Sequence, residues 1–297
     1  MSTRSLPTSP RTPLSLRLVL QILAVLLAAL YVIPALFVIT MSLRPVSDVF
    51  AHPGQILPDS WRWQNYIDAV QSASFGLYFV NSTIVAVIST AAQVILACLA
   101  GYALARIPFK GRDALFLLVI ATLIVPHEVT LVPLFIMLKN VPLAGGNNLF
   151  SQGGIGWLNS YPGLITPHLV SPLSIFLMRQ FFLSLPEELA DAVRIDGGSD
   201  WTILWRIFTP LAKPAVATVA IFAFQDTWND FLWPLVITKT DQMKTLQLGL
   251  TIFYQENSTQ WPLLMAGIIM VSLPIIVLFL FGQRTFTAGI SAGALKG

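Results

Sequence analysis

Long apolar runs alternate with short polar segments along almost the whole chain. A helix needs about 20 mostly apolar residues to cross roughly 30 Å of hydrocarbon. Six runs reach that length, and they are Leu18 to Leu43, Tyr78 to Ala105, Ala114 to Leu138, Pro162 to Leu185, Pro214 to Ile237 and Pro262 to Phe281. The pattern therefore predicts an all-α, polytopic membrane protein with six transmembrane helices.

Composition supports a membrane protein and excludes several other classes. Hydrophobic residues make up 55% of the chain and charged residues only 10%, whereas soluble domains carry about 25% charged residues. The net charge of +3 is too small to suggest a nucleic-acid partner. The single cysteine, Cys98, lies in an apolar run, so we expect a small buried side chain and no intramolecular disulfide. The first apolar run is longer than the core of a secretory signal, so we expect it to be retained.

The basic residues are distributed unequally over the loops, and cytoplasmic loops keep an excess of Lys and Arg. The side shared by both termini holds most of them: Arg4, Arg11, Arg17, Arg106, Lys110, Arg112, Arg179, Arg194, Arg206, Lys213, Arg284 and Lys296. The opposite side holds Arg44, Arg62, Lys139, Lys239 and Lys244. This predicts cytoplasmic tails at residues 1–17 and 286–297. Between them lies a six-span domain at residues 18–285, with a cytoplasmic loop at residues 184–213.

Charge is concentrated in the first half of that loop. Ser184 to Glu187 matches a capping box, and Gly197 and Gly198 supply a left-handed stop, so the segment between them predicts a short amphipathic helix. Isolated helices below about 12 to 15 residues are marginal in water. The helix therefore needs a surface, and the membrane interface, its own bundle and an external partner all remain open.

The second half of the loop predicts another helix. Ser199 is placed as an N-cap before an acidic first turn, and apolar positions continue until Pro210 and Pro214 redirect the chain. The loop is thus expected to consist of a helix, a glycine elbow and a second helix. Prolines within most of the predicted spans favour a channel or transporter over a passive anchor.

At this loop the chain resembles a known family. Asp191-Ala-Val-Arg-Ile-Asp-Gly197, then nine residues, then Ile207-Phe-Thr-Pro210 is similar to the Glu-Ala-Ala signature of ABC importer membrane subunits. Three positions depart from that signature: Asp191 replaces Glu, Val193 replaces the second Ala, and Thr209 replaces Leu.

Segments over most of the chain resemble the second permease subunit of maltose-type carbohydrate importers. They are Phe79-Val-Asn-Ser82, Ala100 to Arg106, Val125 to Phe135, Trp228 to Leu235, Thr245 to Leu250 and Gln283 to Gly297.

The resemblance implies a type I ABC importer permease in a bacterial plasma (inner) membrane. It implies that the loop helix seats in a cytoplasmic ATPase, and the residues it assigns to ATPase coupling are Glu188, Asp191, Ala192, Asp196 and Gly197. The implied partners are a second homologous permease subunit, an ATPase dimer that binds ATP and Mg, an extracytoplasmic solute-binding protein and membrane lipid. The C-terminal tail would reach into the ATPase dimer interface.

The sequence indicates no chemistry of its own. It lacks the Gly-x-x-x-x-Gly-Lys-Ser/Thr loop that cradles nucleotide phosphates. Its three histidines, His52, His127 and His168, are far apart, and His127-Glu128 lacks the second His of a zinc-protease helix. We therefore expect a transport subunit with no catalytic residue, metal site or cofactor in this chain.

Polar residues inside spans are expensive in hydrocarbon and point to the transport pathway. In the fifth span Gln225, Asn229 and Trp233 recur at four-residue intervals, with Asp226 and Asp230 beside them, which predicts one helical face. Aromatic rings beside amides and carboxylates suit a sugar. Interfacial anchoring and helix packing are the alternative.

His127 and Glu128 lie between two prolines of the third span. They are candidates for the pathway or its gate, or for an interior hydrogen-bonded pair. The function that the sequence favours is the import of a di- or oligosaccharide by alternating access. Glycerol 3-phosphate or a related phosphorylated polyol is the alternative substrate, a proton-coupled secondary transporter with His127 and Glu128 as relay is the rival class, and a passive channel is a weaker third possibility.

Overall fold

The computed structural model describes residues 14–51, 55, 57–72, 74–254 and 259–294. Throughout this part the chain forms helices and connecting segments and no strand, which confirms the predicted all-α class. The helices are α1 (Leu14–Ser42), α2 (Asp48–Ala51), α3 (Gln64–Gln71), α4 (Phe75–Arg106), α5 (Arg112–Ala121), α6 (His127–Lys139), α7 (Tyr161–Ile165), α8 (Pro172–Ser184), α9 (Glu188–Ile195), α10 (Asp200–Thr202), α11 (Thr209–Leu211), α12 (Lys213–Asn229), α13 (Leu232–Ile237), α14 (Leu246–Gly249) and α15 (Trp261–Ala294). A π-helix spans Ile203–Phe208, and single 3-10 turns lie at Thr122–Ile124, Thr166–His168, Asp241–Met243 and Leu250–Phe253.

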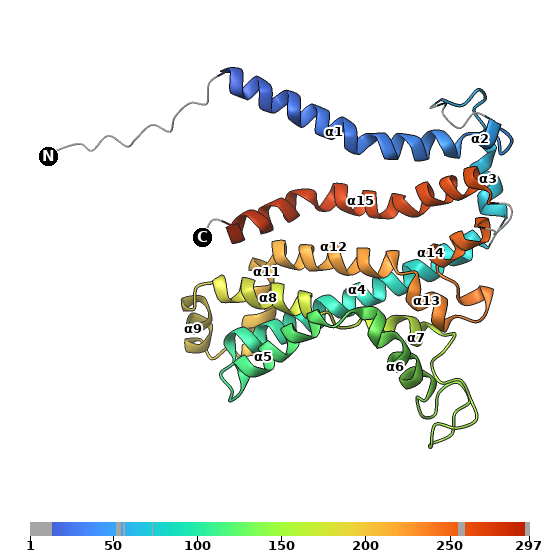
Figure 1. Ribbon diagram of the computed structural model, residues 1–297. Helices are drawn as coiled ribbons and strands as arrows, with labels where there is room; N and C mark the ends of the chain where they lie inside the picture. The colour runs from blue at the N-terminus through green and yellow to red at the C-terminus, as the bar shows by residue number, and fades with distance from the viewer. Residues whose placement is uncertain (1–13, 52–54, 56, 73, 255–258, 295–297) are drawn as a thin grey trace.

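The long helices form an elongated bundle (Figure 1). α4 packs between α8 and α12, α12 packs on α15, and α1 lies along α15. The start of α1, the end of α15 and α9 all lie at one end of the bundle, and α6, α7, α13 and α14 lie towards the other (Figure 1). The expected tail at residues 1–17 lies mostly outside the described residues, and the expected tail at residues 286–297 continues α15 as far as Ala294.

Three helices, α1, α4 and α15, are each long and apolar enough to cross a membrane. Two strongly bent helix pairs would raise the number of spans to five. The predicted count of six is thus not confirmed within the residues that the structure describes. α1 and α15 contain Pro34 and Pro274 and remain continuous, so a proline alone does not end a span here.

The other predicted spans are broken into shorter helices. The third turns by 103° between Ile124 and His127, where Pro126 removes a backbone donor. The fourth divides into α7, a 3-10 turn and α8, with Pro167 and Pro172 at the junctions. The fifth ends at Asn229 and resumes as the short helix α13. A second bend, of 82°, lies between α11 and α12.

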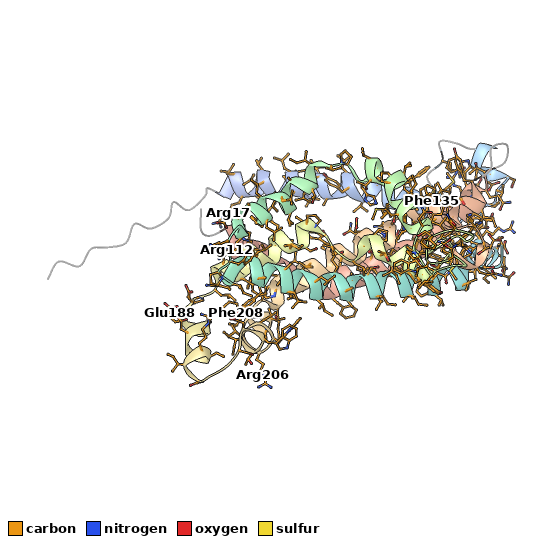
Figure 2. The ribbon with its side chains drawn as sticks, turned by 90° about the horizontal axis from the view of Figure 1, so that it is seen from below. Arg17, Arg112, Phe135, Glu188, Arg206 and Phe208 are labelled. Carbon is orange, nitrogen blue, oxygen red and sulfur yellow. The ribbon has the colours of Figure 1, made fainter. Side chains whose placement is uncertain are left out.

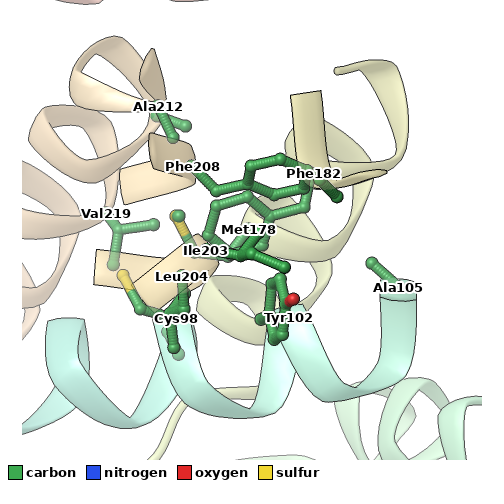
Figure 3. Packing of buried hydrophobic residues seen from close by; sticks show 13 residues of the cluster. Cys98, Tyr102, Ala105, Met178, Phe182, Ile203, Leu204, Phe208, Ala212 and Val219 are labelled. Carbon is green, nitrogen blue, oxygen red and sulfur yellow. The ribbon is translucent and has the colours of Figure 1, made fainter. Parts of the chain in front are cut away.

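The main core cluster lies at the α9 end of the bundle, where α4, α8, the π-helix and α12 meet (Figure 3). Three aromatic rings form its centre: Tyr102 lies edge-on to Phe182 and Phe208 at centroid distances of 6.1 and 5.8 Å. Cys98 is fully buried in this cluster, which confirms the predicted buried thiol. Gly101 allows α4 and α8 to approach, because a Cβ there would lie 2.7 Å from the Met178 Cβ.

Candidate coupling site and polar cluster

α9 projects from one end of the bundle and is exposed along most of its length (Figure 2). All five residues assigned to coupling are exposed to solvent: Glu188, Asp191, Ala192, Asp196 and Gly197. Ala190 is the single buried residue of α9, and with the partly buried Val193 it packs against the main core cluster. The helix therefore has the amphipathic character that the sequence predicted, with a narrow apolar contact.

The predicted capping box at the start of α9 is wrong. The Ser184 hydroxyl donates to the Phe181 carbonyl 2.7 Å away and so belongs to the last turn of α8. Glu187 occupies the N-cap position of α9 without a side-chain cap. The extended backbone at Leu185 separates the two helices, so Ser184 does not occupy the N-cap position of α9.

The predicted glycine stop is confirmed. Gly197 adopts a left-handed conformation with φ of +78°, and the Gly198 N–H donates to the Val193 carbonyl at 2.8 Å. A Cβ on Gly197 would meet nothing within 4 Å, so the backbone conformation is what requires glycine there. Ser199 is the N-cap of the next helix, as predicted, and accepts a hydrogen bond from the Thr202 N–H.

Arg106, at the end of α4, fixes the connection between α8 and α9. Its guanidinium donates to the Phe182 carbonyl at 2.7 and 3.2 Å and also to the Leu185 carbonyl. It lies over the Phe208 ring, 5.2 Å from the centroid. Only a planar, multiply donating cation can satisfy these groups together. The base of α9 is therefore attached to α4.

A chain of polar contacts joins α9 to α4 on the other side of the elbow. Arg194 lies 3.1 Å from the Asp191 carboxylate and 3.3 Å from that of Asp200, and the Tyr102 hydroxyl donates to Asp200 at 2.9 Å. The hydrogen bond from Arg194 to Asp200 raises the pKa of the guanidinium further above its ordinary value. Arg194 is thus a permanent cation beside the carboxylate assigned to docking.

The predicted common face of the fifth span is wrong. α12 ends at Asn229, and the extended backbone at Asp230 separates Trp233 from Gln225 and Asn229. The Trp233 side chain is 1% exposed and donates to the Gly163 carbonyl at 3.0 Å. Trp233 is therefore a core residue, whereas Gln225 and Asn229 remain exposed.

Asp230 belongs to a polar cluster that sequence reasoning missed. His168 lies 3.0 Å from the Asp230 carboxylate and 3.8 Å from that of Asp226, and only 8% of its side chain is exposed. Asp230 also accepts a hydrogen bond from the backbone N–H of Trp233 at 3.2 Å. The one sequence signal was a lone histidine in an apolar span, 62 residues from its partner. Within the described residues, no group of three or more acidic, His or Cys side chains could hold a metal ion.

His127 and Glu128 begin α6 directly after the 103° bend, and both are exposed. They do not form the interior hydrogen-bonded pair that was one interpretation of them. Beyond the bend, α6 packs against α13, so the third and fifth predicted spans meet at Leu138, Trp233 and Ile237.

We expect His168→Ala to destabilise the protein by about 1 to 3 kcal/mol, because it leaves the mostly buried Asp230 carboxylate without its hydrogen-bond partner. Thermal unfolding of the purified permease complex would measure the loss. The double variant His168→Ala/Asp230→Asn should recover part of it, since a neutral amide costs less to bury without a partner than a carboxylate does. Equal losses in the single and double variants would contradict a stabilising contact between His168 and Asp230.

Comparison with known proteins agrees with this architecture. Residues 93–285 match the model of the binding-protein-dependent transport system inner membrane component family. The chain is 35% identical to the arabinooligosaccharides transport system permease protein AraQ of Halalkalibacterium halodurans, over 91% of this chain and 93% of that protein. It is 32% identical to the diacetylchitobiose uptake system permease protein NgcG of Streptomyces coelicolor, over 92% and 87% of the two chains.

A third relative and a solved structure extend the comparison. The sn-glycerol-3-phosphate transport system permease protein UgpE of Yersinia pestis is 33% identical, over 82% of this chain and 85% of that protein. The crystal structure of a bacterial ABC transporter that imports the acidic polysaccharide alginate contains a chain with the same fold, with a TM-score of 0.77 at 23% identity, covering 94% of this chain and all of that chain. Together these matches confirm the resemblance seen at the Asp191 signature, and the chain belongs to the family of binding-protein-dependent transport system inner membrane components.

Proposed function

We propose that the chain is the membrane subunit of an ATP-driven importer for a di- or oligosaccharide, with α9 as the helix that docks into a separate ATPase. The observation that carries the proposal is α9 itself: an exposed, charged helix attached to the core through Arg106 and through Ala190. A force applied to α9 passes directly to α4 and α8, because their side chains form one packed cluster.

The proposal places α9 and both termini in the cytoplasm. Figure 2 places Arg17, Arg112, Glu188 and Arg206 towards one end of the bundle and Phe135 at the other. An excess of basic residues at one end supports a cytoplasmic orientation for that end. The proposed partners are a second homologous permease, an ATPase dimer that holds ATP and Mg, and an extracytoplasmic solute-binding protein. This chain supplies the pathway and the docking helix, and the ATPase supplies hydrolysis.

For the substrate we favour a neutral sugar over a phosphorylated polyol. Two relatives are named for arabinooligosaccharides and diacetylchitobiose, and one for sn-glycerol 3-phosphate. The carboxylate of Asp226 is 79% exposed beside the break in the fifth predicted span. Glu128, the second residue of α6, is also exposed. Carboxylates accept hydrogen bonds from sugar hydroxyls and repel a phosphate dianion.

Reconstituted transport tests this proposal. The complex in proteoliposomes, with its binding protein, would be offered an arabinooligosaccharide, diacetylchitobiose and sn-glycerol 3-phosphate. We expect accumulation of a sugar only when the ATPase and ATP are present. Accumulation on a proton gradient without the ATPase would overturn the proposal and favour a secondary transporter, and uptake of the phosphate ester alone would overturn the choice of substrate.

Asp191 provides a direct test of docking. Asp191→Asn should weaken ATPase binding to the permease pair about tenfold, because hydrogen bonds to a charged group are worth about 1.5 to 3 kcal/mol. Asp191→Glu should retain binding, since it keeps the charge and the family signature carries Glu at that position. Affinity of the purified ATPase for the permease pair in nanodiscs is the measurement. Unchanged affinity in Asp191→Asn would contradict a docking role for this carboxylate.

A further inference from the structure

The polar contacts of Arg194 span the glycine elbow. Arg194 lies near the end of α9 and Asp200 begins α10, so their 3.3 Å ion pair bridges the segment that contains Gly197. Gly197 has a left-handed backbone and open space around it. Side-chain space around Gly197 is therefore open, and the Arg194 to Asp200 bridge joins the two sides of the elbow in addition to the backbone hydrogen bond from the Gly198 N–H to the Val193 carbonyl.

The bridge ends on a rigid residue. The Tyr102 hydroxyl and the Arg194 guanidinium both bind Oδ1 of Asp200, at 2.9 and 3.3 Å. The Tyr102 side chain is 3% exposed, and its ring lies edge-on against Phe182 and Phe208. A tyrosine has few rotatable bonds and this one is enclosed by close packing. The position of its hydroxyl is therefore fixed to α4.

The apolar contacts of α9 are too small to fix its orientation alone. Ala190 is the one fully buried side chain of α9 and contributes a single methyl group to the main core cluster, with only the partly buried Val193 beside it. A small contact of this kind allows the helix to pivot about it, because the contact carries little directional information. A polar chain with defined hydrogen-bond geometry supplies the missing constraint.

We propose that Tyr102, Asp200 and Arg194 are positioning residues that fix the orientation of α9 relative to α4 and hold the Asp191 carboxylate ready for the ATPase. The second part rests on the proposed function, whereas the first concerns the chain alone. Arg194 contacts Asp191 with Nη1 and Asp200 with Nη2. One guanidinium therefore fixes both the orientation of α9 and the position of the Asp191 carboxylate. An incoming cationic partner at Asp191 would have to share that carboxylate with Arg194.

The orientation of α9 can be measured by electron spin resonance between two labels. We would place them at Ile195→Cys, whose native side chain is 86% exposed, and at Ile95→Cys on α4, in the permease pair in nanodiscs. Cys98 is fully buried and does not compete for the label. The unmodified chain should give one narrow distance distribution. Tyr102→Phe, which keeps the ring, should broaden it, and Asp200→Asn and Arg194→Gln should do the same.

Tyr161→Phe is the matched control. The Tyr161 hydroxyl donates to the Asn81 side chain at 2.6 Å towards the other end of α4, so this variant loses the same chemical group far from α9. Its distance distribution should equal that of the unmodified chain. Equal distributions in Tyr102→Phe and the unmodified chain, or equal broadening in Tyr102→Phe and Tyr161→Phe, would overturn the positioning role.

ATPase binding provides the second measurement. We expect Tyr102→Phe to weaken ATPase affinity about threefold to tenfold, the usual range for one hydrogen bond, and Tyr161→Phe to leave it unchanged. In the double variant Tyr102→Phe/Asp200→Asn the two effects should be less than additive. If the unmodified pair binds no ATPase while Tyr102→Phe still broadens the distances, the proposed function fails and the positioning role stands. Full additivity, or unchanged affinity in Tyr102→Phe, would overturn the link to docking.

Discussion

Gly197→Val is expected to abolish uptake while ATP hydrolysis by the assembled importer continues. The native φ of +78° is a conformation that costs a residue with a Cβ about 1 to 2 kcal/mol, and a β-branched side chain tolerates it least. The strain is relieved by turning the elbow, which moves α9 away from its docked orientation. Parallel measurements of solute uptake and ATP hydrolysis in proteoliposomes would separate lost coupling from lost ATPase activity.

Gly111→Val is the control for backbone strain. Gly111, between α4 and α5, has a similar φ of +85° and equally open surroundings, but it lies outside α9 and its elbow. This variant should lose comparable stability and keep uptake coupled to hydrolysis. Gly197→Asn should restore most coupling, since Asn tolerates the left-handed region. Normal uptake in Gly197→Val would contradict a role for the glycine elbow in coupling uptake to ATP hydrolysis.

Trp233→Ala is expected to cost about 3 to 5 kcal/mol of stability, the usual loss for a fully buried tryptophan. Trp233 packs with Leu138, Leu158 and Ile237, and its indole N–H donates a hydrogen bond to the Gly163 carbonyl. Alanine would leave both a cavity and an unpaired carbonyl. Thermal unfolding of the purified complex and the yield of folded protein would report the loss.

Trp201→Ala is the comparison for that variant. The Trp201 side chain is 63% exposed and contacts the Trp205 ring at a centroid distance of 5.8 Å. We expect a stability change within about 0.5 kcal/mol, as for most surface substitutions. A stable Trp233→Ala protein with altered sugar preference would instead indicate that Trp233 lines the transport pathway.

The sequence predicted the continuous helices well because their apolar runs are uninterrupted. The first, second and last predicted spans begin and end close to α1, α4 and the apolar part of α15. It failed at the middle spans, because a hydropathy sum does not register where a proline removes a hydrogen bond. The third span therefore counted as one helix, although the chain turns by 103° around Pro126.

The site was partly predictable for a related reason. Gly197, Ser199 and the exposed face of α9 depend on local chemistry, which the sequence displays directly. The Ser184 capping box failed because the extended backbone at Leu185 ends α8 before α9 begins, so the Ser184 hydroxyl stays in the last turn of α8 and donates to the Phe181 carbonyl. His168 and Asp230 meet only through the tertiary fold, across 62 residues, and no periodicity or spacing indicates that contact.

Arg106 bears on how the protein is made as well as on how it is held together. In the folded chain its side chain is 11% exposed, with carbonyl partners on α8, and Arg179 is 13% exposed and donates to the Leu104 carbonyl. These two cations are therefore fully accessible to lipid headgroups only while the nascent helices are still separate. They can therefore influence membrane topology during biogenesis, before the helices pack together. In the folded protein the same two side chains donate hydrogen bonds to carbonyls inside the bundle.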